Sequence, residues 1–206
     1  MYMKTKNESA VFKLFLLFAA VLLCSLFSPG ADAKAASNRT LSTGRTYTAY
    51  DVTGDGKADT IRLTKGGYTS YDMYTSLTVT VNGSTAYTYK DAYYYGFSVK
   101  LLTLNNGKVF LFITGWGDND DGSAHLLQYK NSTKKFKKIA DFGTMFYKYG
   151  FHVNSNVQSV SGNKIVIRTN LMSYSLAGVS FDMTFSYKSG SLTPASKLTV
   201  NYVNSG

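Results

Sequence analysis

The sequence predicts an all-β fold built from antiparallel strands. Short runs rich in Val, Ile, Thr, Tyr and Phe recur between clusters of Gly, Asn and Ser, which is the pattern of strands joined by turns. No stretch of ten or more residues shows a clear 3.6-residue apolar period, which an amphipathic helix would need. Pro194 is the only proline beyond residue 33, whereas turn residues are abundant.

The first 33 residues are predicted to be a secretory signal peptide. Three lysines precede an apolar run, Leu14–Phe27, and a small-residue cleavage site, Ala31-Asp32-Ala33, follows it. The apolar run is shorter than the ~20 residues that span a bilayer, so an uncleaved membrane anchor is the weaker alternative. Residues 34–45 are small and polar and are expected to form a flexible N-terminal segment, and residues 46–206 a single all-β domain.

Strands bounded by turn residues follow one another along this domain. The two-residue sequence Asn82-Gly83 is a strong hairpin signal. The predicted strands are Thr46–Tyr50, Thr60–Thr64, Ser76–Val81, Ser84–Lys90, Phe97–Leu104, Lys108–Thr114, Ala124–Lys130, Lys135–Phe142, Val157–Val160, Lys164–Thr169, Val179–Lys188 and a strand from Leu192 onward.

An internal similarity groups these strands. The segment Tyr95–Val99 recurs as Tyr149–Val153, and Tyr129–Ser132 is similar to Tyr187–Gly190. Residues 46–95 have the same order of strand, loop, strand and hairpin. The sequence therefore predicts about three units of four strands each, like propeller blades or β-meanders. A β-sandwich or barrel is the alternative architecture.

The acidic segment Asp51–Asp59 is the sharpest motif in the chain. Its oxygen-bearing side chains alternate, at Asp51, Thr53, Asp55 and Asp59, and Gly56 stands where a tight loop turns. Calcium binds six to eight oxygens, and crowded carboxylates repel one another without a cation. The pattern favours a calcium site over a metal-free, Asp-rich turn. An EF-hand fits less well, since Arg62 stands where its bidentate Glu belongs.

This segment resembles the calcium loop of FG-GAP (VCBS-type) repeats, the repeats of integrin-like β-propellers. The resemblance covers the loop and its exit strand, with Thr53 where the pattern has Asn or Asp. It implies a calcium ion held between two strands. The implied ligands are Asp51, Thr53, Asp55, the carbonyl of Lys57 and Asp59.

Two further features are candidates for ligand binding. A second acidic loop carries Asp118, Asp120 and Asp121, and could be a second metal or ligand loop or simply a solvated turn. Beside it lies Trp116, the only tryptophan, whose indole could stack on a sugar ring or fill the core. The tyrosines of the 68–95 region, above all Tyr93, Tyr94 and Tyr95, could form a binding face or simply belong to half-exposed strands.

Composition and the lack of catalytic motifs limit the classes of function that the sequence supports. The formal net charge is +10, which favours anionic extracellular partners such as a glycan or cell-wall polymer. Basic residues are scattered, so nucleic acid is not favoured, and no stable membrane insertion is expected. No nucleophile motif accompanies the two histidines, and no catalytic residue is assigned. We expect a secreted, calcium-stabilised, non-catalytic binding protein. A small polysaccharide hydrolase using paired Asp, such as Asp118 with Asp141 or Asp182, is the alternative.

Overall fold

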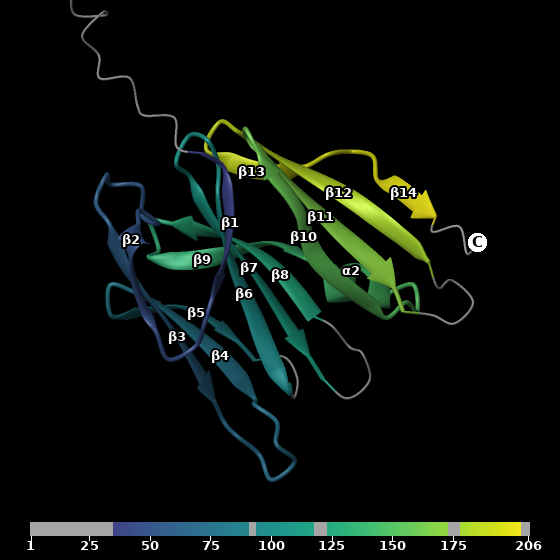
Figure 1. Ribbon diagram of the computed structural model, residues 1–206, viewed down its shortest axis with the longest axis horizontal. Helices are drawn as coiled ribbons and strands as arrows, with labels where there is room; N and C mark the ends of the chain where they lie inside the picture. The colour runs from purple at the N-terminus through teal and green to yellow at the C-terminus, as the bar shows by residue number, and fades with distance from the viewer. Residues whose placement is uncertain (1–34, 91–93, 118–122, 173–177, 203–206) are drawn as a thin grey trace, which may run out of the picture. The chain divides into compact units, whose positions relative to one another are not determined.

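Three antiparallel sheets make up the chain in the computed structural model, which describes residues 35–90, 94–117, 123–172 and 178–202 (Figure 1). The N-terminal sheet has the order β2-β3-β4-β5, the central sheet β1-β6-β7-β8-β9, and the C-terminal sheet β10-β11-β12-β13, with β14 also paired to β12. None of them closes into a barrel. The all-β prediction, in three meander units, is therefore confirmed.

The elements follow the chain in order. Their bounds are β1 (Ser37–Leu41), β2 (Thr46–Tyr50), β3 (Asp59–Gly66), β4 (Ser76–Val81), β5 (Ser84–Tyr89), β6 (Gly96–Thr103), β7 (Val109–Trp116), β8 (Ser123–Lys130), β9 (Lys135–Asp141), α2 (Phe142–Tyr147), β10 (Val153–Ser161), β11 (Lys164–Leu171), β12 (Val179–Lys188), β13 (Ser191–Pro194) and β14 (Thr199–Tyr202). The internal similarity in the sequence marks the starts of β6 and β10 and the ends of β8 and β12, which are equivalent strands of two successive meanders.

The central sheet is buried on both faces, and this explains its composition. Along β7, Val109–Ile113 is continuously buried because alternate side chains enter two different cores. Leu111 and Ile113 pack with Ile61 of β3, whereas Phe110 and Phe112 pack with core residues of the C-terminal sheet. Strands covered on both sides need an unbroken apolar run rather than an alternating one.

The outer sheets have one buried face each. Strand β4 alternates between buried and half-buried residues, and Leu77, Val79 and Val81 point toward the central sheet. Strand β11 does the same through Ile165 and Ile167. Asn82 and Gly83 both have positive φ, at 50° and 77°, as a tight two-residue hairpin between β4 and β5 requires.

The structure differs from the sequence expectation in two places. Within the segment expected to be flexible, Ser37–Leu41 forms β1, which pairs with β6 over its whole length. The exposed, polar character of these residues reflects an edge strand rather than a free lead-in. The predicted strand end at Phe142 is instead the start of α2, where the Asp141 carboxylate accepts a hydrogen bond from the Thr144 N–H.

The N-terminal region lies largely outside the described residues. The predicted signal peptide at residues 1–33 therefore stays a prediction. Among the residues described, no helix has the length and apolar character needed to cross a membrane. Residues Lys34–Gly206 form one compact unit by their contacts.

Candidate functional site

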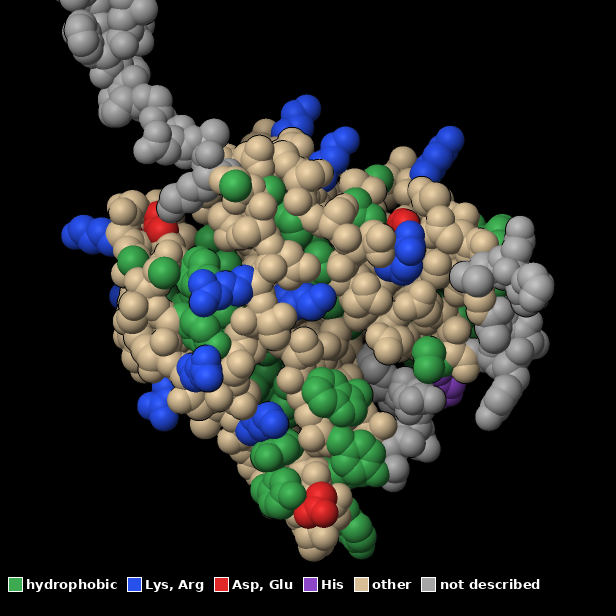
Figure 2. All heavy atoms as spheres, in the orientation of Figure 1, with side chains coloured by type: hydrophobic (Ala, Val, Ile, Leu, Met, Phe, Trp, Pro, Cys, Tyr) green, Lys and Arg blue, Asp and Glu red, His purple; other side chains and the backbone are tan. Residues whose placement is uncertain are grey.

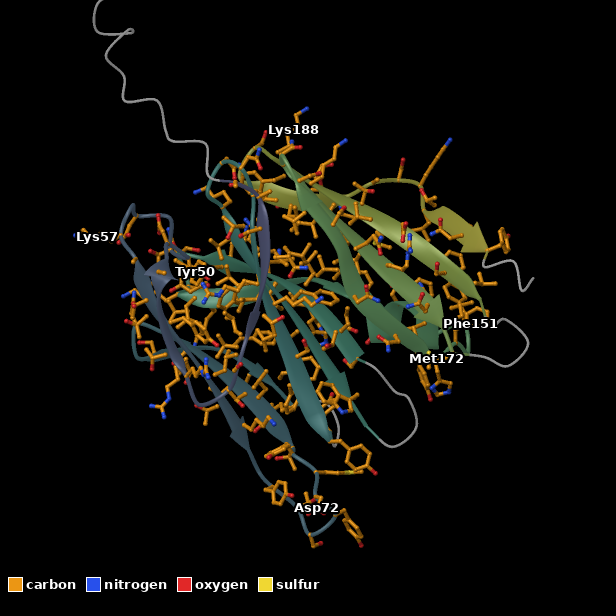
Figure 3. The ribbon with its side chains drawn as sticks, in the orientation of Figure 1. Tyr50, Lys57, Asp72, Phe151, Met172 and Lys188 are labelled. Atoms are coloured by element: carbon orange, nitrogen blue, oxygen red, sulfur yellow. The ribbon has the colours of Figure 1, made fainter. Side chains whose placement is uncertain are left out.

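The acidic loop between β2 and β3 is closed by hydrogen bonds to its own backbone. The Asp51 carboxylate accepts from the N–H groups of Gly54 (2.5 Å), Asp55 (3.1 Å) and Gly56 (2.8 Å). Gly54 and Gly56 have φ of 76° and 86°, so the backbone can curl around this carboxylate. Lys57 extends from the loop into solvent (Figure 3), and its N–H donates to the Asp55 carboxylate.

Asp59 anchors the other side of the loop. Its side chain is only 3% exposed, and Oδ2 accepts from the N–H groups of Val52 (2.7 Å) and Thr53 (2.8 Å). Oδ1 accepts from the Asn82 amide (2.6 Å) and lies 3.4 Å from the Thr53 hydroxyl. A buried carboxylate with this many donors is well satisfied without a cation.

The loop residues do not form a ready calcium cage in this conformation. The three carboxylates face separate sets of donors, and within the described residues no three acidic or histidine side chains gather to hold a metal ion. To bind calcium, the loop would have to exchange backbone hydrogen bonds for ion contacts. The calcium site and the FG-GAP likeness both stay predictions.

A melting experiment separates the two interpretations of this loop. If hydrogen bonds alone hold the loop and no calcium binds, the melting temperature will be the same in millimolar calcium and in chelator. A calcium site would raise the melting temperature in calcium, since a ligand that binds only the native state stabilises it. Under the calcium interpretation, Asp55→Ala would also abolish that rise, because it removes one of the predicted calcium ligands. Within the loop the Asp55 carboxylate accepts only the Lys57 N–H, so few other interactions are lost.

Trp116 lies in a cleft between the central and C-terminal sheets. The indole is 49% exposed, and it crosses β6 directly above Gly96, its partner in the β6–β7 register. A Cβ at position 96 would lie 2.3 Å from the indole ring, so the ring can occupy this place only above a glycine. The cleft has a volume of about 310 Å³.

The walls of this Trp116 cleft carry groups suited to a polar ligand. From the central sheet, Ser98, Lys100 and Thr114 lie on the same face as the indole. From the other side, β10 lines the cleft at Asn154, Ser155 and Asn156, and the exposed Met172 lies at the end of β11 (Figure 3). In the described part of the chain, Lys100 makes no ion pair.

The other predicted ligand-binding residues have different positions. Tyr94 is buried, at 1% exposure, and packs between Tyr89 and Phe97, so it belongs to the core. Tyr95 is exposed and donates its N–H to the Trp116 carbonyl. Tyr93 and the second acidic loop, with Asp118, Asp120 and Asp121, lie outside the described residues.

Sequence reasoning missed Lys100, Asn154 and Asn156. They come together only because β10 crosses the face of the central sheet, and nothing local in the sequence indicates that crossing. Once the β6–β7 pairing is known, however, the alternation of residues places Lys100 on the Trp116 face.

The two described carboxylates considered for acid–base catalysis are both paired with cations. Asp182 receives two hydrogen bonds of 2.8 Å from Arg168, and this interaction lowers its pKa. Burial would raise the pKa of Asp141, but interactions with His125, Lys138 and the Thr144 N–H outweigh burial and lower it. A general acid needs a raised pKa, so neither residue suits that role.

Comparison with known proteins gives no assignment. No protein-family model, curated protein or solved structure matches this chain. The functional argument therefore rests on the Trp116 cleft and its chemistry.

Proposed function

We propose that this protein is an extracellular, non-catalytic binding protein for an anionic glycan, and that the ligand occupies the Trp116 cleft. The observation that carries the proposal is the exposed indole beside Lys100, which makes no ion pair within the described residues, in a cleft that also carries the hydroxyls of Ser98 and Thr114. The placement outside the cell follows from the predicted signal peptide. The calcium prediction is independent, since no residue of the acidic loop lines the cleft.

Each part of the cleft matches a part of a charged sugar. The apolar face of a pyranose ring can stack on the indole, which combines a large apolar surface with one polar N–H. The hydroxyls of Ser98 and Thr114 can each donate to and accept from sugar hydroxyls. Lys100 offers three donors and a full positive charge to an acidic substituent.

The combination of Trp116 and Lys100 favours a glycan that contains uronic acids over other anionic polymers. A polymer of phosphates and open-chain polyols would use Lys100 but would have no ring to cover Trp116. A neutral sugar would cover Trp116 but leave Lys100 without a counter-charge. A uronate supplies both a pyranose face and a carboxylate, and the net charge of +10 adds long-range attraction to polyanions.

Substitution of the indole is the first test. We expect Trp116→Ala to weaken the binding of an oligogalacturonate at least tenfold in titration calorimetry, since truncating a central aromatic contact typically costs about 2 kcal/mol or more. Tyr202→Ala, an exposed tyrosine on β14, is the matched control and should bind like the wild type. Equal affinity of wild type and Trp116→Ala would contradict the proposal, and release of shorter sugars would indicate a hydrolase.

Substitution of the lysine tests the charge. We expect Lys100→Ala to weaken oligogalacturonate binding several-fold and to reduce the dependence of affinity on salt, because one charge-assisted contact is lost. Lys164→Ala removes an exposed charge at the start of β11, outside the cleft, and should change neither quantity appreciably. The same loss of affinity in both variants would instead indicate non-specific polyanion attraction.

A further inference from the structure

Exposed aromatic residues continue from the Trp116 cleft to the tip of the β3–β4 connection. We call Tyr68, Tyr71, Tyr74, Tyr95 and Trp116 the aromatic end. Tyr68 and Tyr71 are 61% and 80% exposed, and Tyr95 and Trp116 are also exposed. Figure 2 shows hydrophobic side chains gathered over the lower end of the molecule, around the tip where Figure 3 labels Asp72.

A chain of contacts links these residues in space. The Tyr95 N–H donates to the Trp116 carbonyl at 2.8 Å. The neighbouring Tyr94 exchanges two backbone hydrogen bonds with Tyr74, of 2.7 and 2.9 Å, which joins the central sheet to the β3–β4 connection. The ring of Tyr74 then lies 4.9 Å from that of Tyr68. These contacts place the aromatic residues at the same end of the molecule, next to the cleft.

The tip is held in place by its own interactions. The Tyr68 hydroxyl donates to the Asp72 carboxylate at 2.9 Å, and the Thr69 N–H donates to the Met73 carbonyl at 2.7 Å. Lys65 places its ammonium 4.4 Å from the centre of the Tyr74 ring. A surface that is already ordered loses little conformational entropy when it binds a ligand.

We infer that the ligand is a uronate chain of several sugar units, which leaves the Trp116 cleft and continues over Tyr95, Tyr68 and Tyr71. This inference rests on the proposed function. Several exposed aromatic side chains that form one surface mark an interaction site, whereas single ones do not. Lys65, in β3 beside Tyr74, and Lys100 in the cleft place positive charges at two points along this path.

The dimensions also favour a long ligand. Residues 67–75 extend beyond the paired parts of β3 and β4, and an arm of four or five residues reaches roughly 15 Å at about 3.3 Å per residue. The cleft volume of about 310 Å³ is at the lower limit of small-molecule pockets, so it holds only a short part of such a chain. Additional sugar units would then add contacts at the tip without changing those in the cleft.

Binding of trigalacturonate and decagalacturonate, measured by calorimetry, tests this inference. We expect wild type to bind the decamer at least tenfold more tightly than the trimer. The double variant Tyr68→Ala/Tyr71→Ala should bind both with the trimer's affinity, and Tyr71→Phe, which keeps the ring, should resemble wild type. Trp116→Ala should weaken both ligands, and Tyr202→Ala neither.

The outcomes distinguish the two proposals. If the trimer binds and depends on Trp116, but the double variant retains the gain in affinity for the decamer, the inference about the tip is wrong and the proposed function stands. If Trp116→Ala changes neither ligand, the proposed function itself is wrong. Binding to phosphatidylglycerol vesicles that the double variant loses, with no length dependence for galacturonates, would assign the tip to a membrane surface and overturn the inference.

Discussion

Asp59→Ala is expected to lower the free energy of unfolding by about 4 kcal/mol. The Asp59 carboxylate is buried, and it accepts the N–H groups of Val52 and Thr53 and the amide of Asn82. Alanine would leave the buried Val52 N–H and the partly buried Thr53 N–H and Asn82 amide without this acceptor, and an unsatisfied buried group costs about 1–3 kcal/mol. The loop and the β4–β5 hairpin would lose their shared anchor at the same time.

Urea unfolding measures this effect, and Asp55→Ala is the matched control. Asp55 lies in the same loop, but it is exposed and accepts only the Lys57 N–H within the loop. Its replacement should change the free energy of unfolding by about 0.5 kcal/mol or less in the absence of calcium. An Asp59→Ala variant as stable as the control would show that the buried hydrogen bonds do not hold the loop. Because both variants are compared without calcium, the result does not depend on the metal prediction.

The same aspartates illustrate how far the sequence alone could reach. Alternating carboxylates with glycines between them suit a cation, but they equally suit a loop whose own N–H groups need acceptors. Both arrangements require Gly56 at positive φ, so the motif predicts a tight loop between two strands without specifying what neutralises its charge. The loop was therefore predictable in place and shape, whereas its internal bonding was not.

Strands were predictable where local pattern and tertiary environment agree. The Asn82-Gly83 hairpin follows from positive φ at two residues, and β4 follows from alternation over one buried face. By contrast, β1 has almost no buried side chains, and it is a strand only because β6 offers it a free edge some sixty residues away. The short α2 likewise depends on the capping bond from Asp141 rather than on an apolar period.

The Trp116 cleft was only partly predictable for the same reason. A lone tryptophan beside a polar loop is compatible with either core or surface. The position of the indole depends on Gly96 of the paired strand, which has no side chain and so leaves room for the ring. Lys100 and Asn154 line the same cleft because of the packing between sheets, which leaves no periodic signal in the sequence. Binding residues that converge from separate meanders need the packing of the sheets to be known.

Asp141→Ala is the second substitution with a large expected effect, a loss of about 3 kcal/mol at neutral pH. The Asp141 carboxylate lies 3.1 Å from Nε2 of the buried His125, whose Nδ1 is 2.7 Å from the Tyr87 hydroxyl. It also caps α2 through the Thr144 N–H and pairs with Lys138. Removing one partner of a buried polar pair costs several kcal/mol, and a lost helix cap costs about 1 kcal/mol. The exposed Lys138 contributes little.

The pH dependence of this loss shows whether charge or packing causes it. The pKa of Asp141 is lowered in the folded state, so its charge stabilises the fold above the unfolded pKa of about 3.9, and this stabilisation declines as the pH falls toward the folded pKa. The difference in unfolding free energy between wild type and Asp141→Ala should therefore be smaller at pH 3 than at pH 5, by about 1 kcal/mol. Equal differences at both pH values would assign the loss to packing and capping alone. Among the described residues, the basic side chains that contact Asp141 are His125 and Lys138, and Tyr89 lies close enough to interact with its charge.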